Sequence, residues 1–411
     1  MSYTFNNRVL IDHEQVSGYD EIHVVQRTPI LEVIPFKGVS AIRDIVEKTG
    51  TANAVDGNTA EIVLYTGSTA NSVVELHTAE RGRYMPGYGA QVGVGIRFAN
   101  ADPQFTNGAY LEWGYEHQET GIEPENGLVF GRDSGGTYVK VTRDGIAVEK
   151  TYQTAWNLDR LDGTGPSGYQ LDLNTGNIYH IDFTWYGYGV VEWGVVIQDP
   201  STLRQRKIIC HVYKPSQQTS LKFPNLPIGV LLSNGNSTSN NVVYVAGRQF
   251  SVVGPFSPDT RIVSDYVASK GTDGTLRPLL SAQSKNTEKD RSISKKIEGF
   301  ELFPVNRDIL VRVMVNSTIS NTSNFKVPAL HANSEVSTIF DITANNEITD
   351  GHCIYTEIVT ASTNRNQTSE STDKGGLFIT IPENQPVTIA VQTLGGSSGT
   401  VAGIFRIREE W

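Results

Sequence analysis

Cysteine, methionine and long apolar runs are scarce in this chain of 411 residues. Its two cysteines, Cys210 and Cys353, lie far apart in the sequence, which favours two reduced thiols and synthesis in a reducing compartment over a disulfide. No apolar stretch approaches the roughly 20 residues that a transmembrane helix needs. The start, MSYTFNNRVLIDHEQ, lacks a basic region followed by a hydrophobic core, so we expect no signal peptide and no membrane insertion.

The chain has fewer basic than acidic residues, and it lacks the runs of residues that favour helices. The formal net charge is -10 at pH 7, whereas proteins that bind nucleic acid present basic patches to its phosphates. We therefore expect no direct nucleic-acid partner. The chain has 39 glycines and many Val, Ile, Thr and Tyr residues, but no long Ala/Leu/Glu/Lys run. This composition predicts an all-β protein.

Residues 156–197 carry the strongest strand pattern. Two runs of bulky residues have the period of two that places them on one face of a strand. The first run contains Tyr179, Ile181, Phe183 and Trp185, and the second contains Val191, Trp193, Val195 and Ile197. Gly187-Tyr188-Gly189 separates the runs, and short glycine-bearing connections close β-hairpins. We predict a hairpin with one face in a core.

The order of strands and turns divides the chain into four parts. Residues 51–255 contain many short strands, including an Asp144-Gly145 hairpin turn, and predict a concanavalin-like jelly-roll sandwich. Residues 1–50 are expected to form an extended N-terminal arm, or alternatively the first strand of that sandwich. Residues 256–298 are predicted to be a linker with a short helix capped near Ser257. Residues 299–411 alternate again, which predicts a second, smaller β-sandwich.

Paired carboxylates are the first candidates for catalysis. Glu112 and Glu116 lie four residues apart in a predicted strand and so share a face, as the two carboxylates of a glycoside hydrolase must do. No acidic residue stands between them, and the interpretation that we favour is two exposed strand residues beside packed aromatics. We therefore predict no catalytic residue and no enzymatic activity.

Three aspartates flank a glycine-rich loop, GTGPSG, at residues 163–168. Asp159, Asp162 and Asp172 could offer oxygens to calcium, but their spacing matches no known calcium loop. Asp also caps turns by accepting from nearby backbone amides, and we favour that role. The loop lacks the Lys-Ser/Thr ending and the following helix of a phosphate loop.

Histidine and cysteine form no recognisable metal or nucleophile motif. The eight histidines show no metal-ligand spacing, and no GxSxG sequence is present. Cys210-His211 and His352-Cys353 are adjacent pairs, whose side chains point to opposite faces of a strand. We predict no metal site and no cofactor.

Aromatic side chains are the remaining candidates for binding. Tyr186, Tyr188, Trp193, Tyr84 and Tyr88 could form a sugar-stacking platform, because flat rings bury area at small entropic cost. The interpretation that we favour is that these rings belong to the core, as most aromatics at strand spacing do. Tyr186 and Tyr188 are the best candidates for exposure, because they flank a glycine in a turn.

The central stretch resembles a family of virion structural proteins from tailed phages and some large algal viruses. Members tend to read WNxDxxDGTGxSGxxLD followed by IDxxWxGxGxVxxG. The matching residues are Trp156, Asn157, Asp159, Asp162, Gly163, Thr164, Gly165, Ser167, Gly168, Leu171, Asp172, Ile178, Ile181, Asp182, Trp185, Gly187, Gly189 and Val191. RYMPG at 83–87 resembles the family's RYxPG segment, and PNLPI at 224–228 resembles its PNLPxR segment, with Gly229 where arginine is usual.

The resemblance implies a non-enzymatic structural component of a virus particle, either capsid-attached or part of a tail or fibre. Its partners would be other virion proteins and further copies of itself, with a trimer as the first expectation. It would assemble in the host cytoplasm and reside in the virion. A carbohydrate-binding host adhesin, with a host surface glycan as partner, is the alternative. A polysaccharide depolymerase acting through Glu112 or Glu116 is a third hypothesis.

Overall fold

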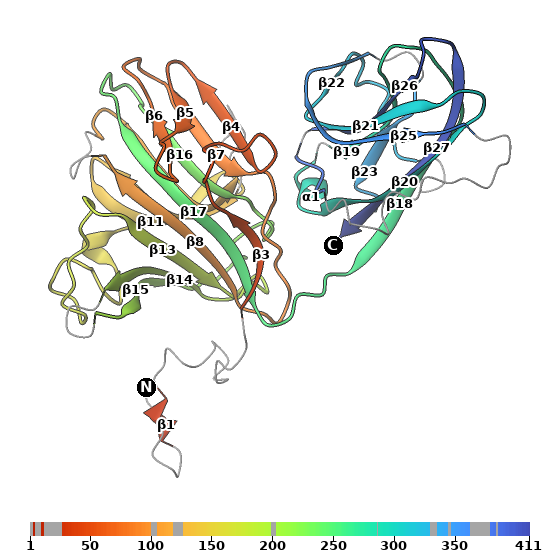
Figure 1. Ribbon diagram of the computed structural model, residues 1–411. Helices are drawn as coiled ribbons and strands as arrows, with labels where there is room; N and C mark the ends of the chain where they lie inside the picture. The colour runs from red at the N-terminus through yellow and green to blue at the C-terminus, as the bar shows by residue number, and fades with distance from the viewer. Residues whose placement is uncertain are drawn as a thin grey trace. The chain divides into compact units, whose positions relative to one another are not determined.

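The chain folds into two compact units, Met1–Ser257 and Pro258–Trp411, each with its own hydrophobic core. The computed structural model describes residues 3–4, 10–11, 27–99, 105–117, 126–198, 203–285, 287–328, 335–343, 347–361, 379–383 and 385–411. Figure 1 shows that both units are built from strands. Within the described residues the α-helical structure is one short helix, α1 (Glu288–Arg291), and no helix there is long and apolar enough to cross a bilayer. The prediction of an all-β protein is confirmed.

Two large antiparallel sheets form the sandwich of the first unit (Figure 1). The seven-stranded sheet has the order β12 (Ile146–Tyr152), β11 (Gly136–Arg143), β10 (Asn126–Asp133), β9 (Tyr110–His117), β16 (Ile228–Ser233), β7 (Val73–Thr78) and β4 (Asp44–Thr49). The eight-stranded sheet has the order β15 (Gln205–Tyr213), β14 (Val191–Gln198), β13 (Asn177–Phe183), β8 (Ala90–Phe98), β17 (Val242–Val253), β6 (Ile62–Tyr65) and β5 (Asn53–Asp56), and β3 (Arg27–Val33) also pairs with β17.

Strands that are distant in sequence lie side by side in both sheets. β16 lies between β9 and β7 in one sheet, and β17 lies between β8 and β6 in the other. Long connections as well as hairpins therefore build the two layers, as in a jelly roll. The predicted hairpin at Asp144-Gly145 is also present, because both residues have positive φ between the paired strands β11 and β12. The prediction of a jelly-roll sandwich is confirmed.

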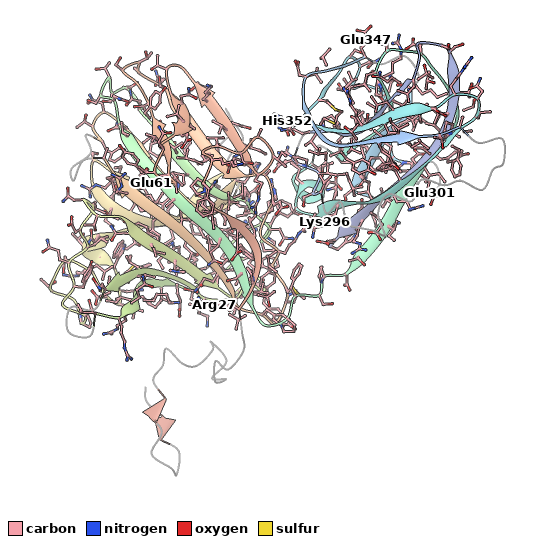
Figure 2. All side chains as sticks on the ribbon, viewed as in Figure 1. Arg27, Glu61, Lys296, Glu301, Glu347 and His352 are labelled. Carbon is pink, nitrogen blue, oxygen red and sulfur yellow. The ribbon has the colours of Figure 1, made fainter. Side chains whose placement is uncertain are left out.

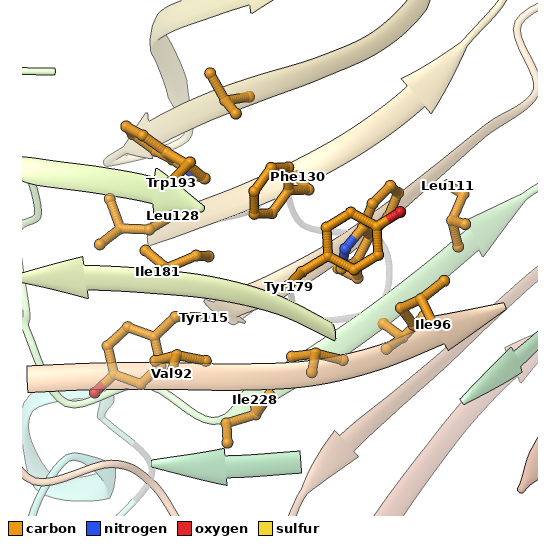
Figure 3. Close-up of a cluster of buried hydrophobic side chains, with 14 of the residues drawn as sticks. Val92, Ile96, Leu111, Tyr115, Leu128, Phe130, Tyr179, Ile181, Trp193 and Ile228 are labelled. Atoms are coloured by element: carbon orange, nitrogen blue, oxygen red, sulfur yellow. The ribbon is translucent and has the colours of Figure 1, made fainter. Parts of the chain in front are cut away.

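Alternation along the strands places one face of each sheet in the core between them. Figure 3 shows part of that core, with Val92, Ile96, Leu111, Tyr115, Leu128, Phe130, Tyr179, Ile181, Trp193 and Ile228 labelled. The Trp113 ring is fully buried among other rings, stacked 5.9 Å from Phe130 and edge-on 4.9 Å from Tyr179. Burial of each such side chain contributes roughly 1.5–3 kcal/mol, which makes this layer the main source of stability in the unit.

The central hairpin is present as predicted. β13 and β14 pair antiparallel, with Ile181 opposite Trp193. Tyr179, Ile181 and Phe183 point into the core, and so does Trp193. Trp185 was expected on the same face, but it follows the last residue of β13 and is only half-buried at the edge of the core.

The sandwich begins before residue 50. Because β3 pairs with β17 and β4 pairs with β7, residues 27–49 belong to the sheets, as the alternative expectation had it, and not to a separate arm. Pro29 lies opposite Ser251, where the register between β3 and β17 shifts and the ladder tolerates a missing N–H. In residues 1–26 the structure describes β1 (Tyr3–Thr4) paired with β2 (Leu10–Ile11), and the remainder of the predicted arm lies outside the described residues.

The second unit is a smaller sandwich, as predicted. Its three-stranded sheet has the order β18 (Thr260–Thr272), β27 (Gly399–Glu410) and β20 (Ser294–Pro304). Its five-stranded sheet has the order β23 (Thr338–Asp341), β19 (Arg277–Ser284), β26 (Val387–Thr393), β21 (Ile309–Val315) and β25 (His352–Val359), and β22 (Thr318–Ile319) pairs with β24 (Ile348–Thr349). Val263 and Phe405 from one sheet meet Val311 and Ile389 from the other in a single core.

The linker predicted over residues 256–298 is wrong, because this segment supplies β18, β19 and the start of β20. β18 pairs with β27 over most of its length, and a register shift between Val267 and Lys270 interrupts its alternation. Because of that bulge and the many polar residues, the sequence of this strand lacks the regular alternation that would have predicted it. The helix expected after Ser257 is therefore strand, and α1 lies further along the chain.

Charged pairs line the face of the three-stranded sheet that points away from the core. Lys296 and Glu301, both on β20 and labelled in Figure 2, pair across the strands with Glu410 at 2.8 Å and with Arg406 at 2.6 Å. Such partly exposed pairs contribute about 0–1 kcal/mol each. They fit a solvated sheet face and do not indicate a chemical site.

Candidate functional site

The five aromatic candidates divide into exposed and buried members. Tyr186 and Tyr188 are 55% and 60% exposed, in the turn that joins β13 to β14. Tyr84 and Tyr88 are half-buried. Trp193 belongs to the core, as the favoured interpretation had it, because the alternation of β14 buries it fully, and its indole N–H donates to a backbone carbonyl of β10 at 3.1 Å.

Three sequence blocks that are far apart in the chain meet at this turn. The Tyr186 backbone N–H donates to the Tyr84 hydroxyl at 3.0 Å. The Tyr84 N–H donates to the side-chain oxygen of Asn225 at 2.9 Å, and the Ser220 N–H donates to the Gly187 carbonyl at 3.0 Å. The RYMPG, WYGYG and PNLPI blocks, on which part of the family resemblance rests, therefore join at one end of the sandwich.

The backbone of the turn adopts a conformation that few residues accept. Tyr186 has φ +36°, which is uncommon for a bulky side chain. A Cβ on Gly187 would lie 2.6 Å from the side chain of Thr219, and one on Gly189 would lie 1.3 Å from the carbonyl oxygen of Thr184. Both positions require glycine, so the two tyrosines are carried on a backbone with little freedom.

The two candidate carboxylates share a face of β9, as predicted, but neither is exposed. Glu112 is 3% and Glu116 is 1% accessible. Glu112 accepts from the Tyr138 hydroxyl at 2.6 Å and from the Lys140 ammonium at 2.5 Å. The expectation of two exposed strand residues is therefore wrong, because side chains of β11 two strands away fold over this face of the sheet.

Glu116 has a different environment from Glu112. It is flanked by Gly127 and Gly229, where an added Cβ would lie 3.1 Å from its side chain, and its Oε1 has no hydrogen-bond partner among the described residues. Burial and then the charge of Glu112 raise the pKa of Glu116 well above the ordinary 4.5, against the opposing effect of Lys140. The neutral acid is therefore the favoured form of Glu116.

Sequence reasoning missed the neighbours that define this polar face. Glu75 and His77 on β7 are buried, and His77 Nδ1 lies 3.4 Å from Glu75 Oε1. The charge of Glu75 also raises the pKa of Glu116. Alternation in β7 and β11 could have placed Glu75, Tyr138 and Lys140 on the polar face of a strand, but only the order of strands brings them to β9. The result is an enclosed network with no open catalytic pair.

The three loop aspartates cap turns, as the favoured interpretation had it. Each accepts from a backbone N–H a few residues further along the chain: Asp159 from Leu161 and Ser167, Asp162 from Thr164, and Asp172 from Asn174. The hydroxyl and the N–H of Thr164 hold the pKa of Asp162 below its usual value. Because the Leu158 and Asp159 N–H groups also donate to the Cys210 carbonyl, the loop is attached to β15.

The two cysteines are free thiols in different units. Cys210 is buried, donates to the Trp193 carbonyl at 3.2 Å and has its pKa raised by burial. Cys353 is exposed on β25, next to exposed His352 (Figure 2). Among the residues that the structure describes, no three His, Cys, Asp or Glu side chains are grouped so that they could hold a metal ion.

The fold defines a two-unit, all-β protein whose first unit is an antiparallel jelly-roll sandwich. No protein-family model and no curated protein matches the chain. Among solved structures, the chain is similar to an endo-1,3-beta-glucanase from Streptomyces sioyaensis, at 9% identity, 56% coverage of this chain, 97% of that chain and TM-score 0.39. It is also similar to the carbohydrate recognition domain of Emp47p (17% identity, coverage 60% and 100%, TM-score 0.34) and to peanut lectin (10%, 55% and 99%, 0.34). Likenesses this distant carry no argument about ligands or chemistry.

Proposed function

We propose that the chain is a non-enzymatic structural component of a virus particle that acts through subunit contacts. The observation that carries this proposal is that the residues on which the family resemblance rests hold the fold together. The RYMPG, WYGYG and PNLPI blocks are bonded to one another at one end of the sandwich. Asp162 of the DGTGPSG loop and Asp159 just before it accept from backbone N–H groups of that loop. These residues build a scaffold, which is what a structural family would share.

The polar face of the seven-stranded sheet supports a non-enzymatic role. A glycosidase needs both carboxylates at the scissile bond, one as acid and one as base or nucleophile. Glu112 is already engaged by Lys140 and Tyr138, and Glu116 is enclosed between glycines. A depolymerase acting through this pair would have to open the sheet face first.

The partners of this component would be other virion proteins and further copies of the chain. Particles repeat their parts by symmetry, and a trimer is the assembly that we propose. Sedimentation of the purified full chain tests it directly. A species of three chains is expected. A monomer at micromolar concentration would contradict the trimer, but it would not contradict a location in the virus particle.

Labelling of purified particles tests the location. An antibody raised against this chain and coupled to gold should decorate intact virions, with a pre-absorbed antibody as control. Label over the head would assign a capsid-attached component, and label at the tail tip a fibre or baseplate component. Absence of label, together with absence of the chain from denatured particles by mass spectrometry, would contradict the proposal.

Carbohydrate-binding host adhesion is the second candidate function, and it can coexist with the first. The exposure of Tyr186 and Tyr188 at one end of the sandwich favours it. Its general test is whether purified protein blocks attachment of the virus to host cells. Unchanged attachment at saturating protein would contradict an adhesion role.

A further inference from the structure

We infer that the tyrosine hairpin, defined as residues 184–190, is a binding platform for a neutral glycan, whose sugar rings stack on Tyr186 and Tyr188. The inference deepens the second candidate function and rests on it. It names the ligand class and the side chains that would hold it, neither of which the fold alone supplies.

The exposed fractions of the two tyrosines indicate a surface that is available to contact a ligand. Both rings are more than half accessible, at 55% and 60%, although each is large and largely apolar. They stand two residues apart in one turn, on either side of Gly187. Sugars have C–H-rich faces that pack on flat rings, and a tyrosine loses few rotamers when it makes such a contact.

The hairpin is fixed before any ligand arrives. Its backbone is bonded on both flanks, to the Tyr84 hydroxyl at 3.0 Å and to the Ser220 N–H at 3.0 Å, and internally from the Gly189 N–H to the Trp185 carbonyl at 2.8 Å. The Tyr84 ring also lies edge-on 5.6 Å from Trp185. Preorganisation lowers the ordering cost of binding, so two rings can hold a weakly bound sugar.

The scarcity of available charge around the hairpin selects the ligand class. The hairpin reads TWYGYGV, and the segments bonded to it read YMPGYGA at 84–90 and PSQQTSL at 215–221, which contain no charged side chain. Of the charged residues that border these segments, Arg83 is buried, Lys222 pairs with Asp144 and Lys214 is exposed. Recognition of anionic sugars or phosphates relies on Arg and Lys. Arg143 does approach, but its guanidinium donates to Thr219 and Gln218. Hydroxyls and amides of this kind match the hydroxyl groups of a neutral sugar.

The test is glycan binding by the full chain, on a panel of neutral and acidic oligosaccharides followed by calorimetry with the best neutral binder. The variants are Tyr188→Ala, which removes one ring, and Tyr186→Asn, because Asn accepts positive φ. Tyr188→Trp keeps a stacking ring. Tyr266→Ala is the matched control, since Tyr266 is 52% exposed in the other unit. Thermal unfolding of each variant verifies the fold.

We expect a neutral glycan to bind with Kd at or below about 1 mM, and Tyr188→Ala and Tyr186→Asn each to weaken binding about tenfold or more. Tyr188→Trp and Tyr266→Ala should bind like the parent. If glycan binds but Tyr188→Ala leaves Kd unchanged, the platform is wrong while adhesion stands. If only acidic glycans bind, the ligand class is wrong. If no glycan binds and Tyr188→Ala instead blocks incorporation into particles, the hairpin is a subunit contact.

Discussion

Two glutamates four residues apart on β9 illustrate how neighbouring residues set the state of a side chain. Glu112 faces a lysine and a tyrosine from β11, whereas Glu116 faces glycines on both adjoining strands. An ionised carboxylate needs donors or solvent to offset its desolvation. Glu112 accepts from two donors, whereas burial and then the charge of Glu112 raise the pKa of Glu116.

Glu116→Gln should make the protein more stable relative to the parent as pH rises. The folded-state pKa of Glu116 is raised, so its contribution to stability is fully present below the unfolded value of 4.5 and is lost as pH rises through the folded value. A neutral amide has no such loss. The difference in unfolding free energy should be near zero at pH 4 and should grow by at most about 1.4 kcal/mol per pH unit above pH 4.5. Urea titrations at several pH values measure it.

Glu112→Gln is the control for that experiment. It removes the carboxylate partner of half-buried Lys140 and should destabilise the protein across the pH range. A pH-independent difference between Glu116→Gln and the parent would contradict the assignment of the raised pKa.

Arg248 and Asp44 form an ion pair with side chains 0% and 1% exposed. Asp44→Ala should lower the unfolding free energy by roughly 3–5 kcal/mol, because it leaves a buried charge without its partner. Replacing both residues, as Asp44→Leu with Arg248→Met, should recover much of that loss. Chemical unfolding of the single and double variants measures both values. A double variant no more stable than the single one would contradict this explanation.

At the scale of elements, the β13–β14 hairpin depends on its glycines. Gly189→Ala would place a Cβ 1.3 Å from the carbonyl oxygen of Thr184, so the turn must distort. We expect a loss of about 1–3 kcal/mol in unfolding free energy. Gly176→Ala is the matched control, because nothing lies within 4 Å of its Cβ and its φ is ordinary. Equal stability of the two variants in thermal unfolding would show that the turn is not constrained.

Strand β18 shows why some elements escape sequence analysis. Val263 and Val267 keep the core face for only part of the strand, and the bulge before Lys270 changes which residues point inward. Partners in β27, more than 100 residues away, stabilise it. A strand that depends on long-range pairing leaves a weak local pattern, whereas β13 and β14 pair across a short turn and leave a strong one.

At the scale of the whole molecule, two separate cores predict two unfolding transitions. Phe405→Ala removes a fully buried ring from the second unit and should cost roughly 3–5 kcal/mol there. Trp113→Ala should do the same in the first unit. In calorimetry each variant should lower one transition and leave the other in place. A single transition that both variants shift equally would contradict separate units.

The sequence by itself determined the local features of this protein. Alternation assigned the core faces of β13 and β14, and glycine marked the turn between them. The tendency of Asp to accept from nearby backbone amides indicated turn caps at Asp159, Asp162 and Asp172. Each of these features depends on residues within about ten positions of one another, and the local geometry of the chain determines which of them can be in contact.

Only the tertiary structure decided which side chains are accessible and which meet across the sheets. Strand order brought Lys140 and Tyr138 over Glu112, enclosed Glu116 and joined three distant blocks at Tyr186. Alternation in the sequence distinguishes the two faces of a strand, but it does not predict which side chains cover the face that points away from the core. That depends on neighbours from other parts of the chain, which is why two carboxylates expected in solvent are buried and the hairpin tyrosines remain exposed.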